Sequence, residues 1–398
     1  MSCKIFALIV NNCNLHRSYF IFFIIFILSC KQNPSTTPPI EFESFPKKTY
    51  VRDDATGDMI TTMIDTSDFH SSENCYQCHS DHVDEWNRSM HSYAMRDPIF
   101  FDGWYEERLK REHTGERFCI QCHSPVAYLS GVKLDQYSTV EGLQNDPELS
   151  MSIKEGVTCT VCHSMTGISQ TTETGYDIAA RADYHMNPGA GIMYGPLELE
   201  PIECVEGAYC HDVKYNSLFR FSESCLPCHD MTVRGKEVES TVSEWKEIPQ
   251  LAMGGQVPCQ ACHMPIKENG YHSHEFIGVD IDLTRDIPAD SLQYKSVEGL
   301  LQNSVELTFS EIMMEASKLS ILISIESLTG HSMPSGTSFS REAWLETVVT
   351  DVNKDSILFS SGTIEGPTSN LDLSDSDLLL YTSNLLDAGG NIITSVTD

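Results

Sequence analysis

Apolar and polar positions alternate along the last third of the chain, in short runs that are rich in β-branched residues. These runs are "SVELTFS", "KLSILISIESL" and "AWLETVVTDV", and all of them lie beyond Thr284. A period of two places the apolar side chains on one face of a strand. We therefore expect a partial β-sandwich-like domain over residues 284–398. Its last run ends soon after the Gly389-Gly390 turn, which would leave an unpaired edge and indicates a truncated domain.

An uninterrupted apolar run, "YFIFFIIFIL", follows Lys4 and Arg17 near the N-terminus and is short for a membrane span. It predicts an export signal over residues 1–30. The run ends at Ile27-Leu28-Ser29-Cys30, which resembles a bacterial lipoprotein cleavage box, so Cys30 is expected to carry lipid. A plain secretory signal with a coincidental cysteine is the alternative.

The segment after Cys30, "KQNPSTTPPIEFESFPKK", is polar and rich in proline, which predicts an extended tether over residues 31–69. By analogy with lipoproteins, Lys31 in place of Asp favours the outer membrane. We thus expect an exported periplasmic or outer-membrane lipoprotein of a Gram-negative bacterium, attached to the membrane through Cys30.

The charge balance is strongly acidic, with 57 acidic and 26 basic residues and a formal net charge of −31. Such a chain repels phosphate backbones, which argues against nucleic-acid binding. It suits redox partner proteins with basic docking faces, although the sequence identifies neither donor nor acceptor. The alternative is that the acidity only maintains solubility.

The pattern Cys-x-x-Cys-His occurs five times, and we number these motifs 1 to 5 along the chain. Two thiols three positions apart can each bond one vinyl group of a haem, and the adjacent imidazole becomes a ligand of its iron. The pattern therefore predicts five covalent c-type haems. The haem-bonding cysteines are Cys75, Cys78, Cys119, Cys122, Cys159, Cys162, Cys225, Cys228, Cys259 and Cys262. The proximal histidines are His79, His123, His163, His229 and His263.

Paired zinc knuckles are the competing interpretation of these cysteines. Zinc does not need a histidine directly after every pair, and five pairs cannot be combined two by two, so haem is favoured. The motifs span residues 75–263, about 38 residues per haem, which is too little chain for an ordinary apolar core. We expect a mostly irregular or α-helical multihaem cytochrome domain over residues 70–283, with sparse secondary structure. Its best helix candidates are "DEWNRSMHSYAM" and "FFDGWYEERLKREH".

A further pair of cysteines departs from this spacing, because five residues separate Cys204 from Cys210 before His211. We expect a disulfide that closes a small loop and presents His211 as a distal ligand. The alternative is a sixth haem on a variant motif, with His211 as its proximal ligand.

Several segments carry a resemblance to multihaem c-type cytochromes, namely the tetrahaem and outer-membrane multihaem families. They include "EWNRSMHSYAMRDPIF", "EGVTCTVCHS", "SESCLPCHD", "EWKEIPQLAMGGQVPCQACHMP", "SHEFIGV" and "GHSMPSGTSFSREAWLETVVTD". The resemblance implies that the Trp-x-x-Ser-x-His and Gly-His-x-x-Pro-Ser-Gly segments supply distal ligands, here His91 and His331. From nearby segments we add His274, His211 and His185 as further distal candidates. The possible substitutes are His70, His82, His113 and His272.

The function that these observations favour is electron transfer, with electrons relayed among several six-coordinate haems in the periplasm or at the outer membrane. Such a chain is an electron carrier rather than an enzyme, and no catalytic residue is assigned. The alternative is a multihaem reductase of a small nitrogen compound or another oxyanion, with one open iron face. Such reductases often replace a proximal histidine by lysine, and no Cys-x-x-Cys-Lys motif occurs here.

Overall fold

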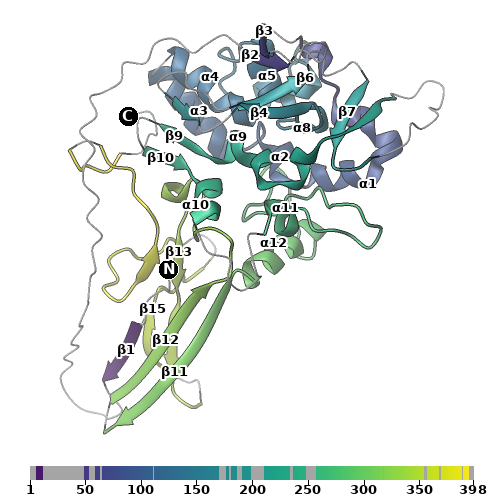
Figure 1. Cartoon of the computed structure of the whole chain (residues 1–398). Coiled ribbons are helices and arrows are strands. Elements are labelled where there is room, and N and C mark those ends of the chain that lie inside the picture. Colours follow the sequence, from purple (N-terminus) through teal and green to yellow (C-terminus); the bar gives the residue numbers. More distant parts are fainter. Residues whose placement is uncertain are drawn as a thin grey trace.

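The computed structural model describes most of the chain from residue 65 onward, together with three short strands before it. The described residues are 6–11, 49–52, 59–62, 65–110, 112–169, 176–178, 181–185, 191–198, 210–233, 236–247, 257–316, 318–353, 356–366, 369–387 and 389–393. They form a helical region and, below it in Figure 1, a group of strands from the C-terminal part of the sequence. No helix within the described residues is long and apolar enough to cross a membrane.

The helical region consists of short helices joined by loops, as the sequence predicts, and α3 is its longest helix with 13 residues. Most of both segments singled out as helix candidates is helical, with a break at Arg88-Ser89 in the first. The helices are α1 (Tyr76–Asn87), α2 (Met90–Tyr93), α3 (Pro98–Lys110), α4 (Glu112–His123), α5 (Pro125–Ser130), α6 (Val140–Gln144), α7 (Met151–Lys154), α8 (Cys159–His163), α9 (Leu226–His229), α10 (Thr241–Glu247), α11 (Cys259–His263) and α12 (Leu292–Gln302). The 3-10 turns are η1 (Thr66–Asp68), η2 (Ser72–Cys75), η3 (Ser217–Arg220), η4 (Ser222–Cys225) and η6 (Ser338–Ser340).

Three small sheets accompany the helices. A four-stranded sheet has the order β3-β2-β6-β4, a three-stranded sheet the order β10-β9-β5, and β7 pairs with β8 in parallel. Their strands are β2 (Thr49–Arg52), β3 (Met59–Thr62), β4 (Met165–Ser169), β5 (Tyr176–Ile178), β6 (Arg181–His185), β7 (Ile192–Gly195), β8 (Asp212–Tyr215), β9 (Met231–Val233) and β10 (Lys236–Glu239). Because β2 and β3 lie between residues 31 and 69, part of the predicted tether is incorporated into a sheet.

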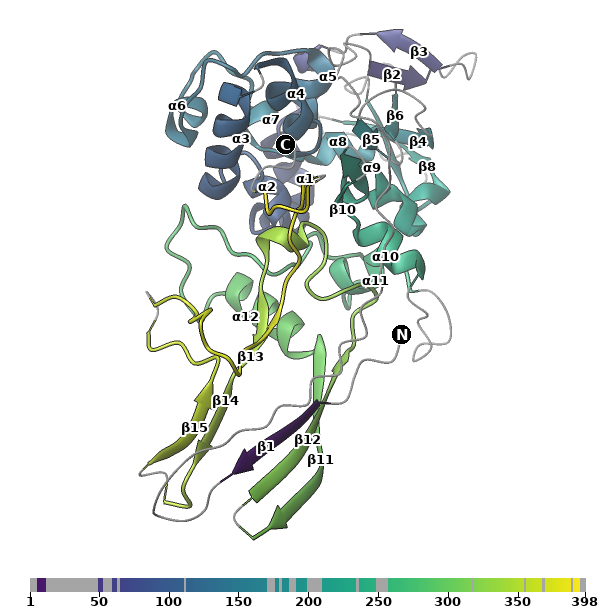
Figure 2. The same ribbon diagram turned by 90° about the vertical axis from the view of Figure 1, so that its left-hand side faces the viewer.

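The C-terminal part of the chain is rich in β-strands, as predicted, but these strands form small separate sheets and show no clear sandwich. They are β11 (Val305–Glu315), β12 (Lys318–Ser327), β13 (Ala343–Leu345), β14 (Thr347–Thr350), β15 (Ile357–Ser361) and β16 (Leu379–Tyr381). β12 lies between β11 and β1 (Phe6–Asn11), whereas β13 pairs only with β16 and β14 only with β15 among the described strands. Figure 2 shows the β14–β15 hairpin and the β1-β12-β11 sheet as separate ribbons. The alternating pattern predicted strands, but their pairing depends on long-range contacts.

The main apolar core lies in the first half of the helical region, around α3, α4 and α5. Its fully buried side chains include Phe101, Trp104, Ile120 and Leu134. Arg108 is buried beside this core, where its guanidinium stacks on Trp104 and donates hydrogen bonds to the carbonyl oxygens of Leu134 and Tyr137. Around motifs 4 and 5 the described apolar cluster is much smaller, and consists of Leu226, Val242 and Trp245.

Candidate haem-binding sites

Each Cys-x-x-Cys-His motif occupies about one helical turn, and that turn stops at its histidine. His123, His163, His229 and His263 are the last residues of α4, α8, α9 and α11. His79 lies within α1 but has non-helical backbone angles, φ −122° and ψ 39°. Residues i, i+3 and i+4 lie on one face of a helix, so a single turn presents both thiols and the imidazole together. All ten motif cysteines are free thiols in this structure.

Four of the proximal histidines face a second histidine ring that comes from a distant part of the sequence. The distances between ring centres are 6.1 Å for His79 and His211, 6.3 Å for His163 and His274, 6.4 Å for His229 and His91, and 6.3 Å for His263 and His331. The structure therefore brings four of the five predicted distal candidates opposite a proximal histidine.

This spacing fits a metal ion between two axial imidazoles. With metal–nitrogen bonds of about 2.0 Å and each ring centre about 1.1 Å beyond its nitrogen, two such rings lie about 6.2 Å apart. Three of the pairs have ring planes within 27° of each other, and the rings of His91 and His229 are tilted by 54°. The residues present thus fit six-coordinate haem irons at four of the five motifs.

The fifth proximal histidine, His123, has a different neighbour. Its ring stacks on that of Phe100, with ring centres 3.6 Å apart and planes within 2°. His185, predicted as a distal ligand, ends β6, but its side chain lies outside the described residues, as does that of His113. No histidine side chain within the described residues therefore faces His123, the proximal histidine of motif 2.

The remaining candidate histidines are placed beside these pairs. The ring of His82 lies edge-on to His274, with centres 4.6 Å apart. His272 contacts the carbonyl oxygen of Met264 through Nδ1, and His70 lies beside the side chain of Asn74. His82 also lies close to the proximal His79, with ring centres 6.0 Å apart and ring planes at 83°.

Burial keeps most of the paired imidazoles neutral, which is the form that binds a metal. It lowers the pKa of His91 and His274 to about 3 and that of His123 to about 4. His229 differs: burial opposes its protonation, but the neighbouring Glu239 carboxylate outweighs this and raises the pKa of His229 to about 9.

Backbone carbonyl groups orient three of the proximal rings. Nδ1 of His123 donates to the carbonyl oxygen of Ala94 at 3.2 Å, that of His163 to Tyr194 at 2.7 Å, and that of His263 to Ile277 at 2.6 Å. Because a carbonyl can only accept a hydrogen bond, the proton is on Nδ1 and Nε2 is left free to bind iron.

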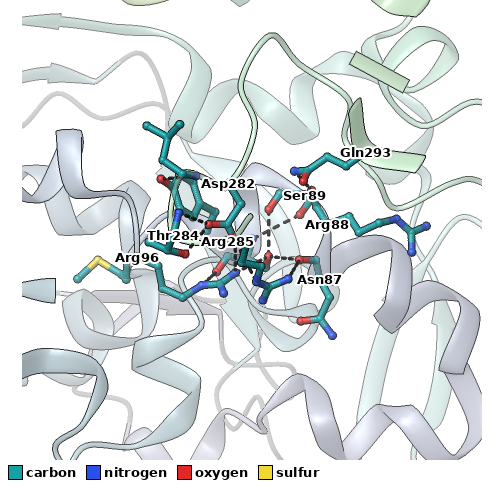
Figure 3. A network of polar contacts seen from close by, with 12 residues as sticks. Asn87, Arg88, Ser89, Arg96, Asp282, Thr284, Arg285 and Gln293 are labelled. Carbon is teal, nitrogen blue, oxygen red and sulfur yellow. Dashed lines mark hydrogen bonds and ion pairs between the residues drawn. The ribbon is translucent and has the colours of Figure 1, made fainter. Parts of the chain in front are cut away.

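A polar network holds the segment that carries His91 in place (Figure 3). Asp282 forms ion pairs with Arg96 at 3.5 Å and with Arg285 at 3.2 Å. Gln293 donates to the carbonyl oxygen of Arg88, three residues before His91, at 2.6 Å. The network thereby ties the chain after motif 5 to the turn between α1 and α2, and so helps to position the His91 ring opposite His229.

The attachment points of different motifs are in direct contact. Three pairs of thiols lie close enough to shift each other's pKa: Cys75 with Cys159, Cys122 with Cys228, and Cys225 with Cys259. Burial raises the pKa of Cys162 to about 12, and the nearby charge of Cys228 adds to the shift. These contacts make neighbours of motifs 1 and 3, 3 and 4, 2 and 4, and 4 and 5.

Cys210 is disulfide-bonded in this structure. Every other cysteine of the described residues is free, so its partner lies outside them, as Cys204 does. The ring of His211, the next residue, faces His79. The arrangement agrees with a loop that presents His211 to the haem of motif 1.

Known proteins share part of this sequence and its overall fold. Residues 74–164, which hold the first three motifs, match the family described as cytochrome c554 and c-prime. The resemblance to multihaem c-type cytochromes is confirmed. The fold is similar to that in the crystal structure of a penta-heme cytochrome c552 from Thermochromatium tepidum, with a TM-score of 0.60 and 22% sequence identity. That similarity covers 83% of this chain and 82% of the other chain. No curated protein matches the chain.

Sequence reasoning missed Glu239, whose Oε1 lies 3.8 Å from Nδ1 of His229. The β9–β10 hairpin explains the contact. β9 begins two residues after His229, and β10 returns antiparallel to it, so that Glu239 pairs with Met231. Two short strand-like runs directly after a haem motif were the available signal.

Proposed function

We propose that the chain is an electron-transfer protein with five covalently bound c-type haems. The observation that carries this proposal is the set of four facing imidazole pairs, each with the spacing of two axial ligands on one iron. When bound, each haem supplies an iron that accepts and releases one electron. The chain's own contribution is to hold the attachment points of neighbouring motifs in contact, so that the cofactors lie close together.

The proposed axial pairs follow from this geometry. We number each haem by its motif. His79 and His211 would hold haem 1, His163 and His274 haem 3, His229 and His91 haem 4, and His263 and His331 haem 5. His123 would be the proximal ligand of haem 2.

The disulfide at Cys210 supports five haems over six, because a thiol in a disulfide is not available to bond a vinyl group. The position of His211 points the same way. A proximal histidine of a sixth haem would need its own iron, whereas His211 already faces His79.

Two measurements on the oxidised, haem-loaded protein test this function together. A haem count by pyridine haemochrome should give five haems per chain. Electron paramagnetic resonance should show low-spin ferric signals for at least four of them, because two imidazoles form a strong axial field. Fewer than five covalent haems, or a mainly high-spin spectrum, would contradict the proposal.

A second candidate function is the reduction of a small nitrogen compound or another oxyanion at haem 2. The observation in its favour is that no imidazole among the described side chains faces His123, whereas the four other proximal histidines each face one. An open iron face would appear as one high-spin ferric haem that changes its spectrum when cyanide or nitric oxide is added. A fully low-spin protein would leave electron transfer as the function.

The location of the protein is part of the proposal and rests on the sequence alone. An export signal that ends at Cys30 would place the haem domain outside the cytoplasm, with lipid on Cys30 as the attachment to the membrane. The acidic charge favours redox partners with basic faces. Free thiols tend to form disulfides outside the cytoplasm. Thioether bonds to haem would protect the motif cysteines from this, so covalent haem is compatible with export.

A further inference from the structure

Among the histidines proposed as proximal ligands, His229 is distinguished by a charged neighbour. His123, His163 and His263 donate from Nδ1 to neutral carbonyl oxygens of the backbone. Nδ1 of His229 instead faces Oε1 of Glu239 at 3.8 Å. The Glu239 side chain is only 13% exposed, whereas that of His229 is 47% exposed, so water screens this contact in part.

The carboxylate of Glu239 is fixed from two sides. Thr241 donates to Oε1 from its hydroxyl at 2.6 Å, and its hydroxyl also lies 3.1 Å from that of Ser335. Gly336 packs on the other oxygen so closely that a Cβ atom there would lie 2.6 Å from Oε2. A larger residue at position 336 would displace the carboxylate, and Gly336 also has φ +71°, which favours glycine.

Ser335 and Gly336 belong to the loop that carries His331. Glu244 anchors the same loop, because its Oε2 accepts hydrogen bonds from the backbone N–H of Ser332 at 3.1 Å and from the hydroxyl of Ser335 at 2.6 Å. Glu239 is therefore held between the ligand sets of haems 4 and 5: it contacts the proximal ligand of one and the distal loop of the other.

A carboxylate beside the outer nitrogen of a metal-bound imidazole draws the Nδ1 proton toward itself and makes the imidazole a stronger electron donor. A more basic ligand and an adjacent negative charge both stabilise ferric iron relative to ferrous iron. His123, His163 and His263 would not share this effect, because their Nδ1 partners are backbone carbonyl groups, which carry no net charge.

We propose that Glu239 is a positioning and tuning residue that lowers the reduction potential of haem 4 relative to the value that a carbonyl partner would give. The inference rests on the proposed function, since it requires haem on motif 4. Motif 4 has thiol contacts with motifs 2 and 5 and lies beside motif 3, so this residue acts at the junction of the haem array.

The test is a spectroelectrochemical titration of the full haem-loaded chain carrying Glu239→Gln, followed by electron paramagnetic resonance to distinguish the haems. The amide keeps the size of the side chain but removes the charge. We expect the reduction potential of one low-spin haem to rise. At a fixed applied potential, its ratio of reduced to oxidised form should increase at least tenfold, which corresponds to about 59 mV for one electron. The other haems should keep their potentials.

Two further variants separate tuning from support of the fold. Glu239→Asp retains the charge and should recover most of the parent potential. Glu244→Gln is the matched control, because Glu244 holds the same loop and, within the described part of the chain, contacts no proximal histidine. It should leave the potential of haem 4 unchanged.

Unchanged potentials in a Glu239→Gln protein that still carries five haems would overturn the inference and leave the proposed function standing. An equal shift from Glu244→Gln would also overturn it, since the effect would then arise from the loop. If the parent protein lacks haem on motif 4, the proposed function fails first, and the haem count reveals this independently of any variant. If Glu239→Gln does not fold, Thr241→Val is the substitute variant, because it removes the hydroxyl hydrogen bond to Oε1 of Glu239. It should also shift the potential of haem 4, and an unchanged potential would show that the inference is wrong.

Discussion

Gly156 lies against the backbone of His91, so close that a Cβ atom at position 156 would be 2.6 Å from the His91 carbonyl oxygen. The N–H of Val157 donates to that same oxygen at 3.0 Å, and Trp86 donates to the carbonyl oxygen of Val157 at 2.8 Å. Gly156 also has φ +75°, a conformation that other residues adopt at a cost. The segment just before motif 3 thus fixes the proposed distal ligand of haem 4.

Replacing Gly156 with Ala should therefore move His91 away from His229. The strained backbone and the clash are expected to cost about 1–3 kcal/mol of stability. Electron paramagnetic resonance should show one additional high-spin haem, and thermal unfolding should occur at a lower temperature. Gly103→Ala is the matched control, because nothing lies within 4 Å of a Cβ atom at that helical position. A low-spin spectrum identical to the parent's would show that the contact does not position His91.

Replacing His331 with Ala should remove the distal ligand of haem 5. Its ring centre is 6.3 Å from that of His263, although 68 residues separate the two in the sequence. One haem should become high-spin and the others should remain low-spin. Added imidazole should restore the low-spin signal by filling the vacated position. His272→Ala serves as the control, since His272 faces no proximal histidine within the described residues, and a spectrum unaffected by the loss of His331 would exclude its role.

The cysteine at position 210 should be alkylated only after reduction. Intact-protein mass spectrometry should count five haems, and reduction should release two thiols, which we expect to be those of Cys204 and Cys210. The physical reason is that a disulfide protects both sulfurs, whereas a thioether to haem resists reduction altogether. Six haems with no releasable thiol would establish the variant motif instead.

Replacing Cys30 with Ser should release the protein from the membrane. Lipid can be attached only to a cysteine at this position, and without acyl chains the acidic haem domain has little affinity for an anionic bilayer. Fractionation of cells that express the variant should find the haem stain in the soluble fraction. Cys13→Ser is the control and should stay with the membranes. Equal membrane retention of both variants would argue against the anchor.

The haem motifs and the helical turn on which each lies could be predicted from the sequence, because their spacing is local. The opposite ligands could be nominated but not matched to their irons. His91 lies only 12 residues after His79, yet it faces His229, because the pairing depends on how distant segments pack. Glu239 was missed for a related reason: only the return of the β9–β10 hairpin brings it beside His229. Strands do follow Thr284 as expected, but their pairing within the described residues shows no clear sandwich.

The uneven distribution of apolar side chains in the helical region has a consequence for how the polypeptide matures. The part around α3, α4 and α5 can collapse on its own buried side chains, such as Phe101, Trp104 and Leu134. Among the described residues, the part that carries motifs 4 and 5 has only the small clusters around Trp245 and Val238, so most of what it can bury is cofactor. Apoprotein should accordingly be protected from protease in its first half and cut in its second. Attachment of the last two macrocycles would then complete the fold.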